Sequence, residues 1–212
     1  MLIVVPAIDR RWEVEVEVEC RRGRLPRARA PVGAGMSSRW QEILTRVADL
    51  QVVGFAEYAL QPSKRQGFGG PFNGQSLRLQ FFSELLEQFR PEAIVETGTY
   101  RGTTTEYMAR ASGLPVWSVE KSPRHFGFAR ARFRRRREVR LRLGDSPSFL
   151  GELLSGSEWW GRRCFVYLDA HGGPGLPLLA ELETVLRSHA AAVVAIDDFE
   201  VPGDPGYGFD DY

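Results

Sequence analysis

The chain has 212 residues, of which 43% are hydrophobic and 26% are charged, and its net charge is +1. This composition predicts one globular domain with a buried core, and the balanced charge gives no general attraction to nucleic acid. Its two cysteines and the lack of an apolar run of about 20 residues argue against a disulfide scaffold and a membrane span. We therefore expect a cytoplasmic protein whose partners include neither nucleic acid nor a membrane.

The first 35 residues differ from the rest of the chain. Residues 12–19 alternate between apolar and acidic side chains, which is typical of a strand with one buried face. A basic stretch rich in Pro, Gly and Ala follows at 21–35 and indicates a linker. Residues 1–35 are thus predicted to be an N-terminal extension, or alternatively an addition upstream of a natural start at Met36.

Residues 36–90 are predicted to form a helical cap or lid region. Ser37 or Ser38 can cap a helix over 39–50, and apolar spacing predicts a second helix over 76–89, before Pro91. The segment 66–75 between them is rich in glycine and aromatic residues. It is either a lid over a bound ligand or a flexible connector.

From residue 91 to residue 212, short apolar runs alternate with segments of helical length. Strands joined by such crossovers predict a Rossmann-like α/β fold: a doubly wound, mostly parallel sheet with flanking helices. Ligands bind such a sheet beyond the carboxyl ends of its strands. The five predicted strands are Ala93–Glu96, Val116–Glu120, Val139–Leu143, Cys164–Asp169 and Ala191–Asp197.

Eight arginines fall within residues 130–142. Such a run can form a nucleic-acid patch. We interpret it instead as the solvated face of a crossover helix and the start of the next strand, balanced by acidic residues elsewhere.

Unusual residues follow the first three predicted strands. Gly98 and Gly102 allow a tight turn and the close approach of a ligand, but their spacing fits neither a dinucleotide fingerprint nor a P-loop. Glu120 can accept both hydroxyls of a ribose, and Asp145 can accept the exocyclic amine of an adenine. The alternatives are an ordinary strand–helix turn, a solvated Glu120 beside Lys121, and a helix cap at Asp145 or Ser146.

Three segments resemble the class I S-adenosylmethionine-dependent methyltransferases: 94–102 is similar to their first motif, 116–120 to their ribose-binding motif and 143–146 to their adenine-contacting turn. The resemblance covers residues 75–212 and implies S-adenosylmethionine as the cofactor, with its methionine part against Glu96–Gly102. The cofactor-binding residues implied by the resemblance are Glu96, Thr97, Gly98, Thr99, Tyr100, Gly102, Thr103, Glu120, Lys121, Gly144, Asp145, Ser146 and Asp169.

Carboxylates also follow the fourth and fifth predicted strands. Asp169 ends one strand, and Asp197 and Asp198 end the next. Adjacent strands lie about 4.8 Å apart, so the three carboxylates would repel one another unless a cation lay between them. Hard oxygen ligands of this kind suit Mg²⁺. Alternatively, Asp197 or Asp198 only caps a turn.

This arrangement is similar to that of the metal-dependent small-molecule O-methyltransferases of the catechol type and the macrolide- or aminocoumarin-sugar type. The resemblance implies Asp169, Asp197 and Asp198 as metal ligands. The catechol enzymes have a lysine base where this chain has Gly172, whereas the sugar enzymes have their base near His171. An imidazole is suited to removing a hydroxyl proton near pH 7, so His171 and Asp169 are the predicted catalytic residues; otherwise His171 is a loop residue.

The predicted activity is metal-dependent O-methylation of a small hydroxylated metabolite. The alternatives are metal-independent methylation of nitrogen or of a protein, and a module that binds S-adenosylmethionine without catalysis. The family fold has a C-terminal two-strand hairpin, for which the residues after Asp198 are too few. Either the chain is truncated, or the exposed sheet edge is covered by the alternating N-terminal strand or by a second copy in a homodimer.

Overall fold

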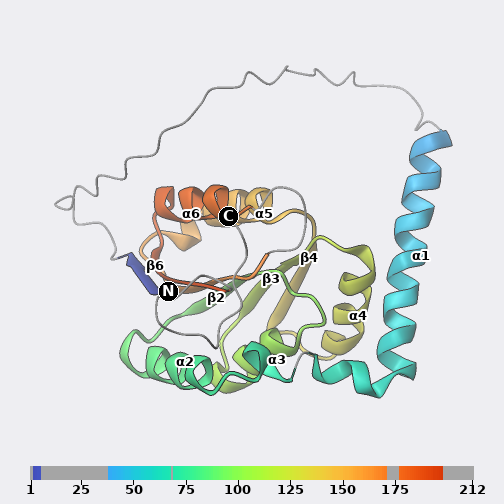
Figure 1. Cartoon of the computed structure of the whole chain (residues 1–212). Coiled ribbons are helices and arrows are strands. Elements are labelled where there is room, and N and C mark those ends of the chain that lie inside the picture. Colours follow the sequence, from blue (N-terminus) through green and yellow to red (C-terminus); the bar gives the residue numbers. More distant parts are fainter. Residues whose placement is uncertain (1, 6–37, 68, 171–176, 198–212) are drawn as a thin grey trace.

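The computed structural model describes residues 2–5, 38–67, 69–170 and 177–197. Among these residues, six strands form one sheet in the order β1-β6-β5-β2-β3-β4, and all except β1 run parallel (Figure 1). This arrangement confirms the predicted doubly wound sheet. The strands are β1 Leu2–Val5, β2 Ala93–Thr97, β3 Val116–Glu120, β4 Val139–Leu143, β5 Arg163–Leu168 and β6 Ala191–Ile196.

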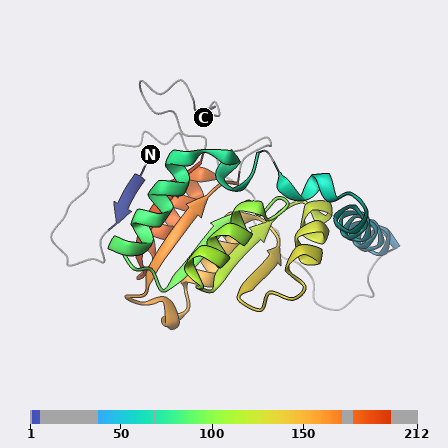
Figure 2. The same ribbon diagram turned by 90° about the horizontal axis from the view of Figure 1, so that it is seen from below.

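Helices cover both faces of the sheet. On one face lie α2 (Ser76–Gln88), α3 (Thr103–Ser112) and α4 (Pro123–Phe133), and on the other lie α5 (Ser146–Leu154) and α6 (Leu178–Arg187) (Figures 1 and 2). Two apolar clusters fill the two layers, and the central strands are buried on both faces. Short 3₁₀ turns complete the described chain: η1 Pro62–Gln66, η2 Pro71–Gly74 and η3 Ser157–Trp159.

An N-terminal strand, β1, covers the β6 edge of the sheet. It pairs antiparallel with β6, from Leu2 opposite Ala195 to Val5 opposite Ala192. It thus lies at the edge where the family resemblance implies a C-terminal hairpin. The predicted strand over 12–19, the linker over 21–35 and the tail after Asp198 lie outside the described residues.

The first helix, α1 (Ser38–Leu60), ends ten residues beyond its predicted end at Leu50 and packs against α4. Gly54 and Gly127 bring the two helices close together, because a Cβ atom on either would collide with backbone atoms of the other helix. Glu57 adds ion pairs to Lys64 and Arg124, and these hydrogen bonds lower its pKa to about 2. This tertiary contact explains why α1 continues beyond its predicted end.

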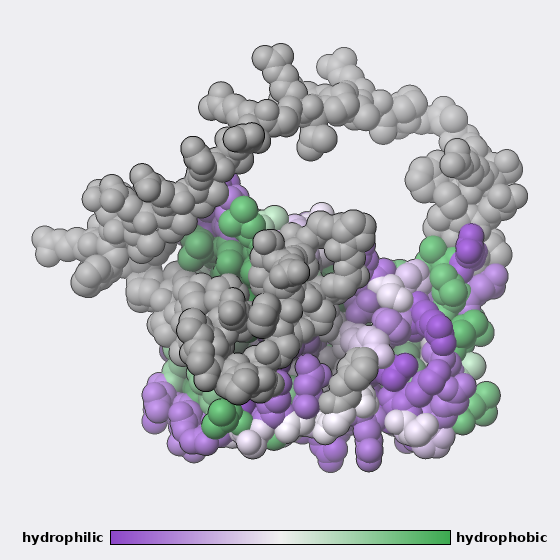
Figure 3. All heavy atoms as spheres, in the orientation of Figure 1, coloured by the Kyte–Doolittle hydropathy of each residue, from purple (hydrophilic) through white to green (hydrophobic). Residues whose placement is uncertain are grey.

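Apolar side chains remain exposed on α1, which Figure 3 shows as green atoms over this helix. They include Val52, Phe55 and Leu60. The helix contains too many charged residues to be apolar throughout, and no helix in the described ranges has the length and hydropathy of a membrane span.

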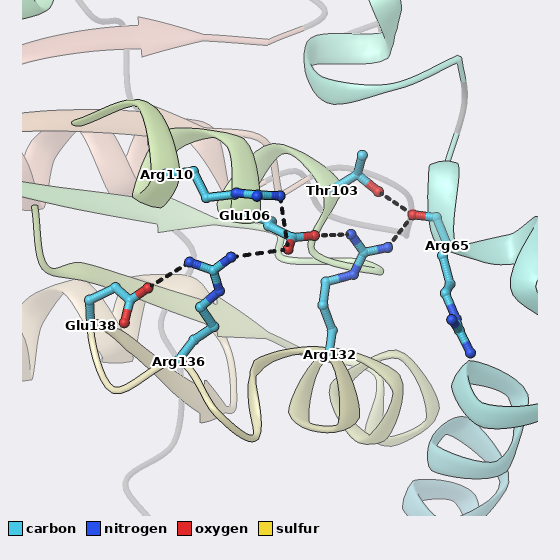
Figure 4. Close-up of polar contacts among 7 residues, drawn as sticks. All are labelled: Arg65, Thr103, Glu106, Arg110, Arg132, Arg136 and Glu138. Carbon is cyan, nitrogen blue, oxygen red and sulfur yellow. Dashed lines mark hydrogen bonds and ion pairs between the residues drawn. The ribbon is translucent and has the colours of Figure 1, made fainter. Parts of the chain in front are cut away.

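The arginine run is mostly a solvated face. The Arg132 side chain is only 6% exposed and donates to Glu106 at 2.8 Å, while Arg136 pairs with Glu106 and Glu138 (Figure 4). The guanidinium of Arg132 also donates to the backbone carbonyl of Arg65. The predicted solvated face balanced by acids agrees with the structure, since six of the eight arginines are exposed; Arg132 differs because it links α4 to α3 and η1.

Candidate functional site

The predicted site residues lie at or just after the carboxyl ends of the parallel strands. These ends lie side by side and form the carboxyl edge of the sheet, which is distinct from the β6 edge that β1 covers. In the pairing register, Thr97 lies beside Val119 and Leu168, and Leu168 lies beside Ile196. The order of strands along the chain reverses between β2 and β5, since β3 and β4 follow on one side and β6 on the other. This edge is the position at which doubly wound sheets bind ligands.

A glycine loop leads from β2 into α3. Gly98 has φ +83°, and a Cβ atom there would collide with the carbonyl oxygen of Asp169 at the end of β5. Gly102 has φ +74°, and a Cβ atom there would collide with the ring of Phe133. The backbone N–H groups of Gly98 and Thr99 both donate to Val119. Only glycine suits these two positions, and the loop is therefore fixed against β3 and β5.

Glu96 lies beneath this loop and not on its surface. Its side chain is fully buried, and its Oε2 accepts hydrogen bonds from the hydroxyls of Thr105 at 2.5 Å and Ser118 at 2.6 Å. The Ser118 hydroxyl is also 2.5 Å from that of Thr99. Burial raises the pKa of Glu96 to about 7, which the two hydroxyls partly oppose. The structure therefore places Glu96 where it connects β2, β3 and α3.

Glu120 holds the tip of the glycine loop. Its Oε2 accepts the N–H of Tyr100 at 2.6 Å, and its Oε1 accepts the N–H of Ser122 at 2.7 Å. Tyr100 has φ +49°, a left-handed conformation that is unusual for tyrosine and that this hydrogen bond helps to hold. Burial raises the pKa of Glu120, and the N–H donors oppose the shift. Lys121, the next residue, is exposed.

The turn after β4 lies beside the end of β3. The N–H of Gly144 donates to the carbonyl of Glu120, which joins the two strand ends. Asp145 is exposed and caps α5 by accepting the N–H of Ser148 at 3.0 Å, a hydrogen bond that lowers its pKa. The helix cap considered as an alternative for Asp145 is thus present. Ser146 is buried in the first turn of α5.

Glu181 is a buried acid at this edge that sequence reasoning missed. It lies in the first turn of α6 and is 1% exposed. Burial raises its pKa, whereas the hydroxyls of Ser146 and Thr97 favour its charged form. Thr97 ends β2 and Ser146 follows β4, so Glu181 lies near the ends of these two strands. Its position on an amphipathic helix predicts a solvated residue instead.

Two of the three predicted metal ligands lie within the described residues. The N–H of Asp169 donates to Thr97, and the N–H of Asp197 donates to Leu168, so both follow directly from paired strand ends. Asp169 is half-buried and Asp197 is 3% exposed. The Asp197 carboxylate forms an ion pair with the guanidinium of Arg78, which comes from the first turn of α2.

The remaining predicted residues of the acceptor side, His171 and Asp198, lie outside the described residues. Within the described ranges, no three His, Cys, Asp or Glu side chains come together as a metal-binding group. Asp197, as placed, does not fit a metal ligand, because its carboxylate already has a cationic partner. Arg78 was not foreseen, since a basic residue on a predicted amphipathic helix gives no sign of a buried partner.

Comparisons with known proteins do not assign this chain to a family. No protein-family model matches the chain, and no curated protein does. Among solved structures, the S-adenosylhomocysteine-bound methyltransferase PaMTH1 of Podospora anserina has a TM-score of 0.48 and 14% identity over 79% of this chain and 74% of its own. Cofactor-bound Rv0187 from MTB has a TM-score of 0.47 and 17% identity over 78% of this chain and 74% of its own.

An O-methyltransferase from Bacillus cereus in complex with S-adenosylhomocysteine has a TM-score of 0.40 and 22% identity, over 66% of this chain and 57% of its own. Such values describe a likeness of fold alone. A function for this chain therefore has to rest on its own residues.

Proposed function

We propose that this protein binds S-adenosylmethionine at the carboxyl edge of its sheet and transfers the methyl group to an oxygen of a small hydroxylated molecule. The observation that carries the proposal is the contact between the glycine loop and Glu120. Their hydrogen bond, from the N–H of Tyr100, lies beside the place where the strand order reverses.

The loop and Glu120 suit two parts of the donor. Gly98 and Gly102 have positive φ values and pack against Asp169 and Phe133, which fixes the loop whose backbone we propose lies against the methionine part. Each Glu120 oxygen accepts one N–H from the protein. A carboxylate offers about four lone-pair sites in total, so acceptor capacity remains for the two ribose hydroxyls.

Asp145 suits the adenine end of the donor. Its lowered pKa keeps it ionised, and its Oδ2 caps α5 through Ser148. Its other oxygen can then accept the exocyclic amine of adenine. Capping the helix and binding adenine are therefore compatible, although sequence reasoning treats them as alternatives.

The reaction that we propose is a direct in-line transfer. A lone pair of the acceptor oxygen forms the new bond to the methyl carbon, and the sulfur–methyl bond breaks with its electrons returning to sulfur. The products are a methyl ether, S-adenosylhomocysteine and a proton, which we assign to the imidazole of His171. The magnesium ion expected from the sequence enters no step, because Arg78 holds the carboxylate of Asp197.

The test is ligand-induced stabilisation followed by turnover. S-adenosylmethionine or S-adenosylhomocysteine at a hundred times its Kd should raise the Tm by about 5 °C or more, whereas NAD⁺ and ATP should not. Formation of S-adenosylhomocysteine with catechol or methyl glucoside as acceptor would then show O-methylation. Stabilisation by ATP or NAD⁺ alone would contradict the proposal, and donor binding without turnover on any acceptor, including amines and proteins, would favour a non-catalytic module.

A further inference from the structure

The acceptor side of the site contains a buried ion pair between distant parts of the chain. Asp197 follows β6 and its side chain is 1% exposed, while Arg78 belongs to α2 and its side chain is 13% exposed. The half-buried Asp169 follows the neighbouring strand, in the register that places it next to Asp197. The guanidinium of Arg78, from α2, thus contacts a carboxylate at the carboxyl ends of β5 and β6.

We infer that the guanidinium of Arg78 fills the cation position at the ends of β5 and β6, and that methyl transfer at this edge proceeds without a divalent metal. The inference rests on the proposed function only in placing the acceptor at this edge. Arg78 acts through Asp197 and is therefore a positioning residue.

Burial explains why the two residues remain paired. A carboxylate removed from water requires a compensating charge or hydrogen bonds, and the Arg78 guanidinium supplies a permanent positive charge. A divalent ion at Asp197 would have to displace this guanidinium from the carboxylate, at the cost of breaking a buried ion pair. The pair also holds the first turn of α2 against the end of β6.

Because Asp197 is a buried carboxylate, substitutions that remove or keep the positive charge of Arg78 test whether Arg78 occupies a cation position. In Arg78→Met the side chain keeps an unbranched apolar stem but loses its guanidinium, so the buried carboxylate lacks its cation and the protein is destabilised. Added MgCl₂ or MnCl₂ can then occupy the vacated position. Arg78→Lys keeps a positive charge and should behave like the wild type. Arg187→Met, at an exposed arginine paired with Glu183 on α6, is the matched control.

The measurement is the Tm of each variant with EDTA and with millimolar MgCl₂ or MnCl₂. We expect no shift for the wild type, Arg78→Lys and Arg187→Met, and a rise of about 3 °C or more for Arg78→Met. If Arg78→Met is insoluble with EDTA, its soluble yield with MgCl₂ provides the same comparison.

Metal-dependent stabilisation of the wild type would overturn the inference. So would the lack of any metal response in Arg78→Met, because the guanidinium would then not occupy a cation position. Binding of S-adenosylhomocysteine to the wild type in EDTA is measured in parallel. Its failure would refute the proposed function, while the metal response would still decide the role of Arg78.

Discussion

At the scale of single residues, Glu96 shows how burial changes the role of a carboxyl group. It lies one residue before the end of β2, and its Oε2 accepts the hydroxyls of Thr105 and Ser118 under the glycine loop. Burial raises its pKa from 4.5 to about 7. We therefore interpret Glu96 as a support for the loop, with Glu120 as the acid better placed for the donor.

This pKa makes the contribution of Glu96 to stability depend on pH. Between pH 4.5 and about 7 the folded protein holds a proton that the unfolded chain has released. The contribution is thus complete below the unfolded pKa and is lost as the pH rises through the folded pKa. Relative to Glu96→Gln, the wild type should lose about 3 kcal/mol of unfolding free energy between about pH 4 and about pH 8.

Urea denaturation of both proteins over this pH range tests the prediction. Glu183→Gln, which removes an exposed carboxylate on α6, controls for the loss of one negative charge. If the difference between wild type and Glu96→Gln stays constant with pH, Glu96 does not bind a proton on folding in this range.

Which site residues can be predicted depends on whether their position follows from local pattern. Gly98, Glu120 and Asp145 come directly after apolar runs, so the sequence places them at strand ends. Arg78 and Glu181 lie on amphipathic helices, and their surroundings are determined by how those helices pack against the sheet. No periodicity distinguishes them from solvated charges.

At the scale of elements, the packing of α1 on α4 depends on two glycines. Gly54 in α1 lies against the backbone of Arg124, and Gly127 in α4 lies against the backbone of Gln51. Tyr58 and Phe128 add an edge-to-face contact with ring centroids 5.3 Å apart. This close crossing holds the helical region before residue 90 to the sheet domain.

A methyl group at the crossing should separate the helices. Gly54→Ala is expected to lower the unfolding free energy by about 2 kcal/mol or more, because its Cβ cannot fit against the carbonyl of Arg124. Gly151→Ala is the matched control: it also lies within a helix, α5, but its added Cβ meets nothing within 4 Å. That variant should gain about 0.5 kcal/mol or more from helix propensity.

Thermal or urea denaturation of the two variants gives the comparison. Equal stabilities would mean that α1 and α4 do not cross at Gly54. The same packing explains a difference from the sequence-based prediction, since α1 continues to Leu60 through residues that it buries against α4.

The regular elements divide into those that local pattern predicts and those that it does not. The bounds of β3 and β4 agree with prediction, those of β2 and β6 differ by one residue at one end, and those of β5 differ by one residue at each end. β2, β5 and β6 are mostly apolar and buried, as expected for a parallel sheet with both faces covered, whereas β4 at the sheet edge alternates apolar residues with the exposed Arg140 and Arg142. The run that forms β1 has only four residues, and its pairing with β6 is a long-range contact that no local pattern indicates.

At the scale of the whole molecule, strand order brings distant residues to one edge. This edge carries the glycine loop after β2, Glu120 at the end of β3, the Asp145 turn after β4 and the acids after β5 and β6. Alternation of strands and helices predicts this edge, because right-handed crossovers fix the direction of the parallel strands. The cation at its acceptor end could not be predicted, since it comes from α2, before the first parallel strand.

The most direct test of the donor site is the affinity for S-adenosylhomocysteine, measured by isothermal titration calorimetry on the wild type and Glu120→Gln. The account predicts one site per chain in the wild type. The variant should bind at least about tenfold more weakly, because the ribose hydroxyls lose a charged acceptor. Equal affinity in the two proteins, or no binding to the wild type, would contradict a donor site at the end of β3.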